Sequence, residues 1–233
     1  MIDLFIVDFD GFVVDSMEVG LRQQQGLAVE LGLGRPNMAV LRKWVGVPVD
    51  AYALGIARDC GWPEGSARRF EQIILDTEEP EFGLFDGVLE MLVRLRDRGK
   101  ILCLLTNRDP GSFPKVCAKI RLPEFVTGEK GHMRLFDVAQ VHGDAQEAKP
   151  HPGVFSGPIG NLIRDMQIPL SRIALTGDTR TDWETARNFG IPTFVGAVTG
   201  VTTIQEFEAM GVPNSHIIIN PADLDQVPGI AAP

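Results

Sequence analysis

The sequence predicts an α/β protein built on a parallel, doubly wound sheet. Two observations support this fold class. Short apolar runs rich in strand-forming residues alternate with helical patterns over most of the chain, as expected for parallel strands joined by crossover helices. Between the first such run and about residue 80, the pattern is helical and contains no convincing strand. A helical segment is therefore expected after the first strand, either as part of the same core or as an insertion.

The first expected strand, residues 4–7, ends in two carboxylates. Its four residues are all apolar, which suits a strand buried on both faces. Asp8 and Asp10 follow directly, before the chain turns at Gly11. Like charges this close together are unfavourable unless a cation or a proton lies between them, so such a pair usually marks a functional site.

The remaining elements are delimited by caps and by glycine and proline breaks. The spacing from Asp15 to Glu18 is that of a capping box and predicts the first helix, with Asp15 as its cap. Residues 121–134 are expected to form a long loop. Further helices are expected over residues 40–45, 51–60, 66–75, 87–98, 112–120, 152–167, 181–189 and 202–210, and strands over residues 101–105, 136–141, 173–176, 193–195 and 216–219.

Three of the strands end in polar side chains. These are Asp8 and Asp10, then Thr106 and Asn107, and then Asp178 and Asp182. Ligands of open α/β sheets bind outside the carboxyl ends of the strands, so the three ends are expected to meet at one crevice. Lys149, just before a helix, adds a cation. Taken singly, Thr106 and Asn107 also suit an ordinary turn, Lys149 a solvated surface, and Asp182 a helix cap.

Composition narrows the class of protein. The chain has 233 residues, of which 44% are hydrophobic, enough for a substantial core. Its net charge of −9 argues against nucleic acids and anionic membranes as partners. Three widely spaced cysteines predict reduced thiols. With no evident leader and no apolar run that would span a bilayer, a cytoplasmic protein is expected.

At these residues the chain resembles the haloacid dehalogenase superfamily. The family's four motifs occur in order as Asp8-x-Asp10-Gly11 with Asp15-Ser16, Thr106-Asn107, Lys149-Pro-His-Pro152, and Gly177-Asp178-x-x-x-Asp182. The third has the form usual in the phosphoglycolate phosphatase and beta-phosphoglucomutase branch. Phe12 departs from the pattern, which usually has Thr or Val there. We expect its ring to pack beneath the turn with Val13 and Val14 rather than to enter the crevice.

The resemblance implies a Mg²⁺-dependent phosphatase that acts on a small phosphorylated metabolite. Asp8 would be the nucleophile that forms an aspartyl-phosphate, and Asp10 would be the general acid and base. Asp8, Asp178 and Asp182 would bind Mg²⁺, together with the main-chain carbonyl of Asp10. The groups that hold the phosphoryl oxygens would be Thr106, the main-chain N–H of Asn107, and Lys149, with Gly11 beside the substrate.

The resemblance also implies that residues 16–81 form a small helical cap, inserted into a Rossmann-like core of residues 1–15 and 82–233. The substrate-specificity loop of the cap would fall on Arg42, Lys43, Trp44 and Gly46. An ordinary helix end explains these four residues equally well.

Several alternatives stay open at this point. Asp10 favours phosphate esters over halides, because a halide leaving group needs no proton. A phosphonatase would rely on a cap lysine such as Lys43, and a phosphomutase would use the same core residues as a phosphatase. A non-catalytic relic that binds phosphorylated metabolites would explain Phe12, but the retention of the other motif residues argues against it. The substrate and the oligomeric state, monomer or homodimer, are not predicted.

Overall fold

The protein folds around a six-stranded, all-parallel sheet with the strand order β3-β2-β1-β4-β5-β6. The structure is a computed structural model that describes residues 1–122 and 135–230. The strands are β1 (Leu4–Val7), β2 (Ile101–Leu105), β3 (Val138–Gln140), β4 (Ile173–Gly177), β5 (Thr193–Ala197) and β6 (Ile217–Ile218). The predicted parallel α/β fold is therefore confirmed, and β1 lies at the centre between β2 and β4.

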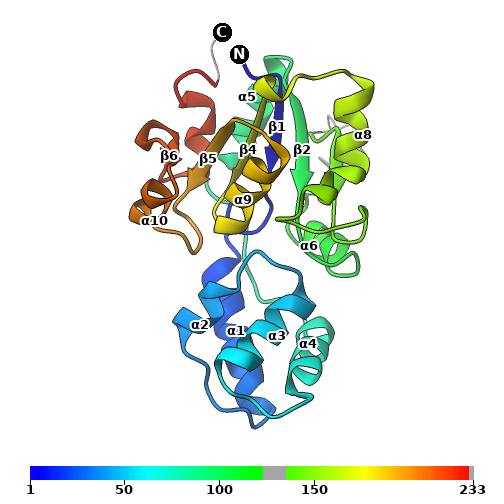
Figure 1. The fold of residues 1–233 in the computed structure, drawn as a ribbon, viewed down its shortest axis with the longest axis vertical. Coiled ribbons are helices and arrows are strands. Elements are labelled where there is room, and N and C mark those ends of the chain that lie inside the picture. The colour runs from blue at the N-terminus through cyan, green and yellow to red at the C-terminus, as the bar shows by residue number, and fades with distance from the viewer. Residues whose placement is uncertain (123–134, 231–233) are drawn as a thin grey trace.

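Helices cover both faces of the sheet (Figure 1). They are α5 (Val88–Asp97) and α6 (Phe113–Lys119) on one side, and α8 (Pro158–Asp165), α9 (Arg180–Phe189) and α10 (Ile204–Ala209) on the other. Side chains alternate along β1, so Phe5 and Val7 join the first hydrophobic cluster, while Leu4 and Ile6 join the second. Burial of β1 on both faces explains its uninterrupted apolar sequence.

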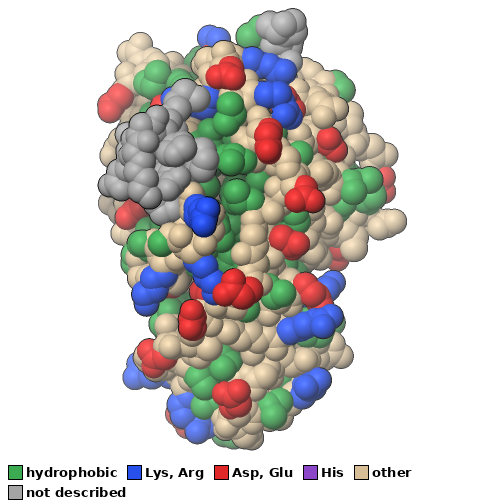
Figure 2. Space-filling model, turned by 180° about the vertical axis from the view of Figure 1, so that it is seen from behind, with side chains coloured by type: hydrophobic (Ala, Val, Ile, Leu, Met, Phe, Trp, Pro, Cys, Tyr) green, Lys and Arg blue, Asp and Glu red, His purple; other side chains and the backbone are tan. Residues whose placement is uncertain are grey.

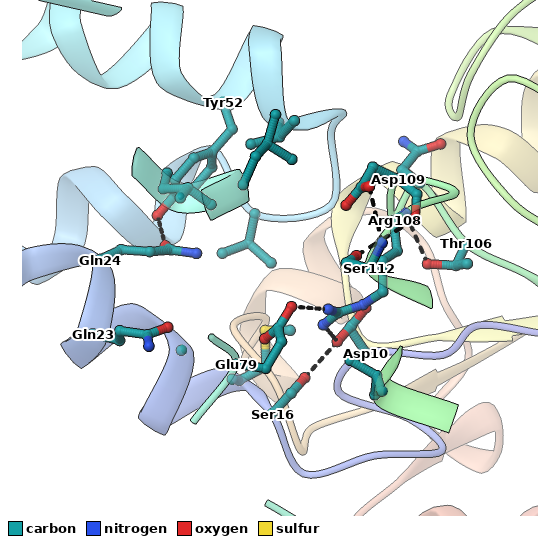
Figure 3. Close-up of a pocket in the computed structure, with 18 of the residues that line it drawn as sticks. Asp10, Ser16, Gln23, Gln24, Tyr52, Glu79, Thr106, Arg108, Asp109 and Ser112 are labelled. Atoms are coloured by element: carbon teal, nitrogen blue, oxygen red, sulfur yellow. Dashed lines mark hydrogen bonds and ion pairs between the residues drawn. The ribbon is translucent and has the colours of Figure 1, made fainter. Parts of the chain in front are cut away.

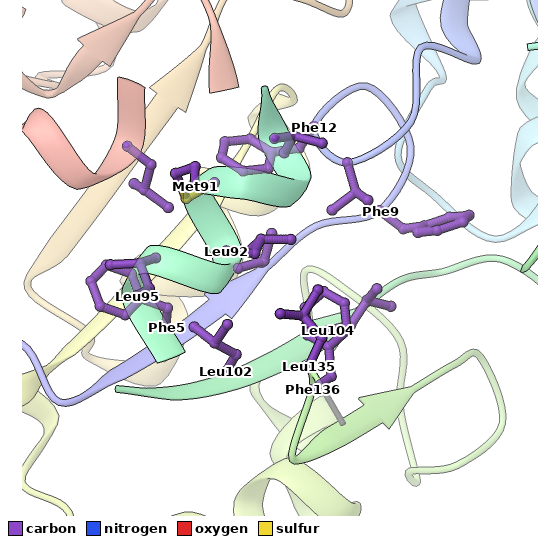
Figure 4. Packing of buried hydrophobic residues seen from close by; sticks show 14 of the residues in the cluster. Phe5, Phe9, Phe12, Met91, Leu92, Leu95, Leu102, Leu104, Leu135 and Phe136 are labelled. Atoms are coloured by element: carbon purple, nitrogen blue, oxygen red, sulfur yellow. The ribbon is translucent and has the colours of Figure 1, made fainter. Parts of the chain in front are cut away.

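Phe12 is fully buried in the first cluster, close to Met91 of α5 (Figure 4). Phe9 lies nearby and makes an edge-to-face contact with Phe113. The expectation that the Phe12 ring packs beneath the turn is confirmed. The departure from the family pattern therefore enlarges the core under the first motif and leaves the crevice open.

Four helices between β1 and α5 pack on one another around a third hydrophobic cluster. They are α1 (Met17–Glu30), α2 (Met38–Lys43), α3 (Val49–Asp59) and α4 (Ser66–Asp76). Figure 1 shows them as a separate group at one end of the molecule, beyond the sheet, and Figure 2 shows the same group from behind, again at the lower end. Among the described residues, no helix is long and apolar enough to cross a membrane.

The two chain segments that join these four helices to the sheet run side by side. The Asp15 N–H donates to the Gly83 carbonyl at 2.9 Å, and the Phe85 N–H donates to the Val13 carbonyl at 3.1 Å. An antiparallel bridge between Val14 and Leu84 lies between these bonds. The entry to the helical group and the exit from it are therefore fastened together at one place.

Three predicted elements differ in the structure. The capping box at Asp15 does not form: Ser16 is the N-cap residue, and its hydroxyl donates to Asp10 rather than to the helix. The predicted helix over 152–167 is split, because Pro158 lacks an N–H and begins a new helix after a 3₁₀ turn at Pro152–Ser156. The strand predicted over 136–141 is limited to β3. Most of the loop expected over 121–134 lies outside the described residues.

Candidate active site

The strand ends that carry polar residues meet at one edge of the sheet, as predicted. Asp8 follows β1, Thr106 follows β2 and Asp178 follows β4, and these strands are immediate neighbours. A pocket of about 680 Å³ opens there between the sheet edge and the helical group, where it is lined by α1, α3, α4 and the loop between α2 and α3. Figure 3 shows Asp10, Thr106 and Arg108 on the sheet side of this pocket and Tyr52, Gln23 and Gln24 on the helical side.

Lys149 lies at the floor of the pocket, buried between two carboxylates. Its Nζ is 2.6 Å from Asp8 Oδ1 and 2.6 Å from Asp182 Oδ1, and it also donates to the Leu105 carbonyl at 3.3 Å. Burial lowers the pKa of an ammonium group, but the charges of Asp182 and Asp8 outweigh it and raise the pKa of Lys149. Lys149 is therefore a permanent cation at this place and not a solvated surface lysine.

Asn107 fixes the position of Lys149 through its side chain. The Asn107 Oδ1 accepts the Lys149 N–H at 3.0 Å, and Nδ2 donates to the Lys149 carbonyl at 2.9 Å. The same Nδ2 donates to the Gly46 carbonyl at 2.8 Å, which ties the loop after α2 to the sheet edge. The sequence pattern assigns Asn107 a main-chain role, and these side-chain bonds add a second one.

Three carboxylates form a buried cluster that suits a divalent cation. Asp8, Asp178 and Asp182 each offer one oxygen, and these oxygens lie within 4.8 Å of one another. Asp178 is fully buried, and neither of its oxygens has a hydrogen-bond partner. An unpaired buried carboxylate is costly, whereas oxygen donors with negative charge are the preferred ligands of Mg²⁺. The residues present therefore fit the predicted metal. The Asp10 side chain is not part of this cluster.

Burial and mutual repulsion within the cluster shift the pKa values of its own carboxyl groups. Burial, and then the charge of Asp182, raise the pKa of Asp8 to about 7, although Lys149 acts in the opposite direction. Burial and the charge of Asp8 likewise raise the pKa of Asp178. Asp182 is held by Lys149 and by a capping box with Thr179, whose N–H and hydroxyl both donate to Asp182 Oδ2. Asp182 is therefore both a helix-capping residue and a member of the acidic cluster.

Two glycines allow other loops to approach Asp178. A Cβ atom on Gly11, which has φ +80°, would lie 2.4 Å from Asp178 Oδ2, and one on Gly200 would lie 1.5 Å from the same atom. Thr199 Oγ1 donates to the Gly11 carbonyl at 2.5 Å, which joins the two loops. Gly11 thus lies beside the acidic cluster. A glycine is required there because a side chain would collide with Asp178 and because the backbone has a positive φ.

Asp10 is held by an arginine that the sequence analysis did not identify. Arg108 Nε donates to Asp10 Oδ2 at 3.0 Å and its terminal nitrogen donates to Oδ1 at 2.5 Å, while Ser16 Oγ donates to Oδ1 at 2.7 Å. Although burial alone raises the pKa of Asp10, Arg108 holds it below the ordinary value. On its other side Arg108 pairs with Glu79. The sequence feature that could have identified Arg108 is its position directly after Thr106 and Asn107.

Of the remaining residues predicted for the site, some line the pocket and others do not. Thr106 lines the pocket, and its hydroxyl oxygen accepts the Arg108 N–H at 3.1 Å. Gly46 also lines the pocket. Trp44 does not: its ring covers Gly55, and its N–H donates to Asp59 at 2.9 Å. Arg42 and Lys43 point elsewhere as well, since they pair with Glu18 and Asp59 respectively.

Comparisons with known proteins agree with this arrangement. A family model described as haloacid dehalogenase-like hydrolase matches residues 5–196, which include the motif residues from Asp8 to Asp182. No curated protein matches the chain in sequence.

The chain is similar to solved structures over almost its whole length. One is a predicted phosphoglycolate phosphatase from Haemophilus somnus, with 19% identity, 97% of each chain covered and a TM-score of 0.74. Another is a haloacid dehalogenase-like hydrolase from Bacteroides fragilis, with 20% identity, 96% of this chain and 100% of that chain covered, and a TM-score of 0.73. A predicted beta-phosphoglucomutase from Thermotoga maritima has 15% identity, 95% and 96% coverage, and a TM-score of 0.62. At these identities the likeness shows a shared fold.

Proposed function

The chain belongs to the haloacid dehalogenase-like hydrolase family, and on this basis we propose that it is a Mg²⁺-dependent phosphatase of small phosphorylated metabolites. The observation that carries the proposal is the position of Asp8. This carboxylate lies at the end of the central strand, in contact with Lys149 at 2.6 Å and beside the unpaired Asp178, at the floor of a pocket large enough for a metabolite.

In the first step, a carboxylate oxygen of Asp8 attacks the phosphorus atom. A bond forms between Asp8 and phosphorus, and the bond between phosphorus and the ester oxygen breaks. Asp10 donates a proton to the departing oxygen, so the leaving group departs as a neutral alcohol. Lys149, which is fixed by Asn107, and the Thr106 hydroxyl would stabilise the charge on the phosphoryl oxygens.

In the second step, water hydrolyses the aspartyl-phosphate. Asp10, now a carboxylate, takes a proton from the water as its oxygen bonds to phosphorus, and Asp8 is released with inorganic phosphate. Asp8, Asp178 and Asp182 would hold the metal ion, which, when bound, offsets the repulsion between the phosphoryl group and these carboxylates.

Residues 16–81 are proposed to act as the cap over this site. Their helices supply one wall of the pocket, and their two connections to the core are bonded to each other between Val13 and Phe85 and between Asp15 and Gly83. Movement at this paired connection would open the pocket to substrate and close it against water.

The test is release of inorganic phosphate from a panel of phosphate esters, with and without Mg²⁺. We expect Mg²⁺-dependent release by the native protein and none by Asp8→Asn. The matched control is Asp165→Asn, the same substitution at an exposed position at the end of α8. A product that is an isomerised sugar phosphate, with no free phosphate, would indicate a phosphomutase instead. No turnover of any ester at saturating Mg²⁺ would contradict the proposal.

A further inference from the structure

The pocket wall that faces the catalytic groups is built by the helices α1, α3 and α4 and by the loop between α2 and α3. We call it the cap wall. Its apolar side chains are those of Met17, Leu21, Val45, Val47, Val49, Ile74 and Leu75. Its polar side chains near the middle are neutral: Gln23, Gln24 and Tyr52 lie together on this side of the pocket (Figure 3).

Among the described residues, none of the cap-wall side chains that line the pocket is a lysine or an arginine. The cap's own cations are engaged elsewhere, since Arg42 pairs with Glu18 and Lys43 with Asp59. The charged groups that line the pocket at the end of α4 and directly after it are instead acidic: Asp76, Glu78 and Glu79. A second anionic group on a substrate would therefore meet apolar surface or like charge on this side.

The cations of the sheet side are largely committed to protein acceptors. Arg108 is divided between Asp10 and Glu79. Lys119 donates to the Glu79 carbonyl at 2.9 Å and pairs with Glu81 at 2.8 Å. Lys149 is buried on Asp8 and Asp182. Besides these three, Lys115 is the one lysine or arginine among the described lining residues; it is an exposed residue of α6 on the sheet side and does not belong to the cap wall.

The neutral polar groups of the cap wall are arranged to meet hydroxyl groups. Tyr52 donates its hydroxyl to Gln24 Oε1, which orients the Gln24 amide so that its nitrogen is available as a donor toward the pocket (Figure 3). Gln23 donates to the Glu78 carbonyl at 2.7 Å, which holds its amide oxygen, an acceptor, at the same wall. An amide donor and an amide acceptor beside apolar side chains match a polyhydroxy compound with an apolar face.

From this arrangement we infer that the substrate is a phosphate monoester of an uncharged polyhydroxy alcohol, with no second phosphate and no carboxylate. The inference rests on the proposed phosphatase function and narrows its substrate class. The pocket volume of about 680 Å³ also exceeds what a two-carbon acid would fill. The leaving group lies against the cap wall, while the phosphoryl group lies over Asp8.

The inference is tested with pairs of substrates that differ in one charged group. Glycerol phosphate is compared with phosphoglycerate, and glucose phosphate with phosphogluconate. We expect the neutral member of each pair to have the higher kcat/KM by at least about tenfold. A Gln24→Lys variant places a cation on the cap wall and is expected to shift the ratio toward the carboxylate member by about tenfold. Gln205→Lys, an exposed position on α10 that does not line the pocket, is the matched control and should leave the ratio unchanged.

Two outcomes would overturn the inference: a native preference for the carboxylate members, or a Gln24→Lys ratio equal to that of Gln205→Lys. If Gln24→Lys does not fold, Gln23→Lys takes its place. Asp8-dependent hydrolysis of p-nitrophenyl phosphate reports the proposed function separately. If that hydrolysis occurs and carboxylate substrates are preferred, only the substrate inference fails. If no ester at all is hydrolysed, the phosphatase proposal fails, and the substrate inference fails with it.

Discussion

Arg108 donates to both carboxylate oxygens of Asp10, at 3.0 Å and 2.5 Å, and so holds the proposed acid and base as an anion. This state suits the second step, in which Asp10 accepts a proton. The first step needs Asp10 protonated, so Arg108 must withdraw from it when substrate binds. Its second partner, Glu79, lies on the segment that connects α4 to the core, which would couple this withdrawal to movement of the cap.

We expect Arg108→Ala to raise the pKa of Asp10, because the cation that lowers it is gone. The high-pH limb of kcat/KM, which reports loss of the acid's proton, should therefore move to higher pH. Arg108→Lys keeps a charge and should stay closer to the native profile. A full pH profile of the three proteins is the measurement. An identical high-pH limb in all three proteins would show that Arg108 does not lower the pKa of Asp10.

We expect stabilisation by Mg²⁺ to increase with pH. The pKa of Asp8 rises from an ordinary 3.8 to about 7 in the fold. The metal-free folded state therefore binds a proton that the unfolded state releases, so this contribution to stability is present below pH 4 and is lost as the pH rises through about 7. Metal binding needs the ionised carboxylates, so Mg²⁺ should stabilise the fold more at higher pH and offset this loss of stability. Thermal unfolding with and without millimolar Mg²⁺ would measure both trends; a Mg²⁺ effect that falls as the pH rises would contradict this assignment.

Gly200→Ala should weaken metal binding without replacing any of the proposed metal ligands. The new methyl group would lie 1.5 Å from Asp178 Oδ2, so the carboxylate or the loop must move. Displacing a ligand's support typically costs roughly 10–100-fold in metal affinity. Titration of Mg²⁺ followed by thermal unfolding is the test. Gly26→Ala, inside α1 with no atom near the added methyl group, is the control and should stabilise the protein by about 0.5–1 kcal/mol with unchanged metal affinity. Equal affinities in both variants would be evidence against Asp178 as a ligand.

Phe12→Thr should destabilise the fold far more than it alters catalysis. The ring is fully buried beside Met91, and its removal leaves a cavity that costs about 3 kcal/mol or more. Asp8 and Asp10 keep their hydrogen bonds to other residues, so kcat/KM should change by less than about tenfold at a temperature well below the unfolding midpoint. Denaturant unfolding and kinetics on one substrate measure the two effects. A gain of several hundredfold in activity would instead favour the relic hypothesis.

The sequence predicted the sheet, its central strand and the meeting of three strand ends because these depend on local apolar runs and on the general topology of parallel sheets. β1 and β2 have the predicted bounds, since both faces of each are buried. The split at Pro158 was harder to place, because the sequence shows that proline disturbs a helix but not on which side a new helix begins.

The environment of Asp10 could not be predicted in the same way. Ser16 was available to cap α1, and only the folded structure shows its hydroxyl on Asp10 instead. Arg108 and Glu79 are separated by 29 residues, and their pairing depends on how the helical segment returns to the core. From its position in the sequence, Trp44 was expected in the substrate-specificity loop. Because Gly55 has no side chain, the Trp44 ring instead packs within the helical group.

The central claim, that Asp8 is the nucleophile, is tested most directly by ¹⁹F NMR of the beryllofluoride adduct, which mimics an aspartyl-phosphate. With Mg²⁺ and beryllofluoride, the native protein should show bound fluorine resonances that are absent in Asp8→Asn and retained in Asp165→Asn. Resonances that persist unchanged in Asp8→Asn, or their absence from the native protein at saturating Mg²⁺ and beryllofluoride, would contradict the assignment of Asp8.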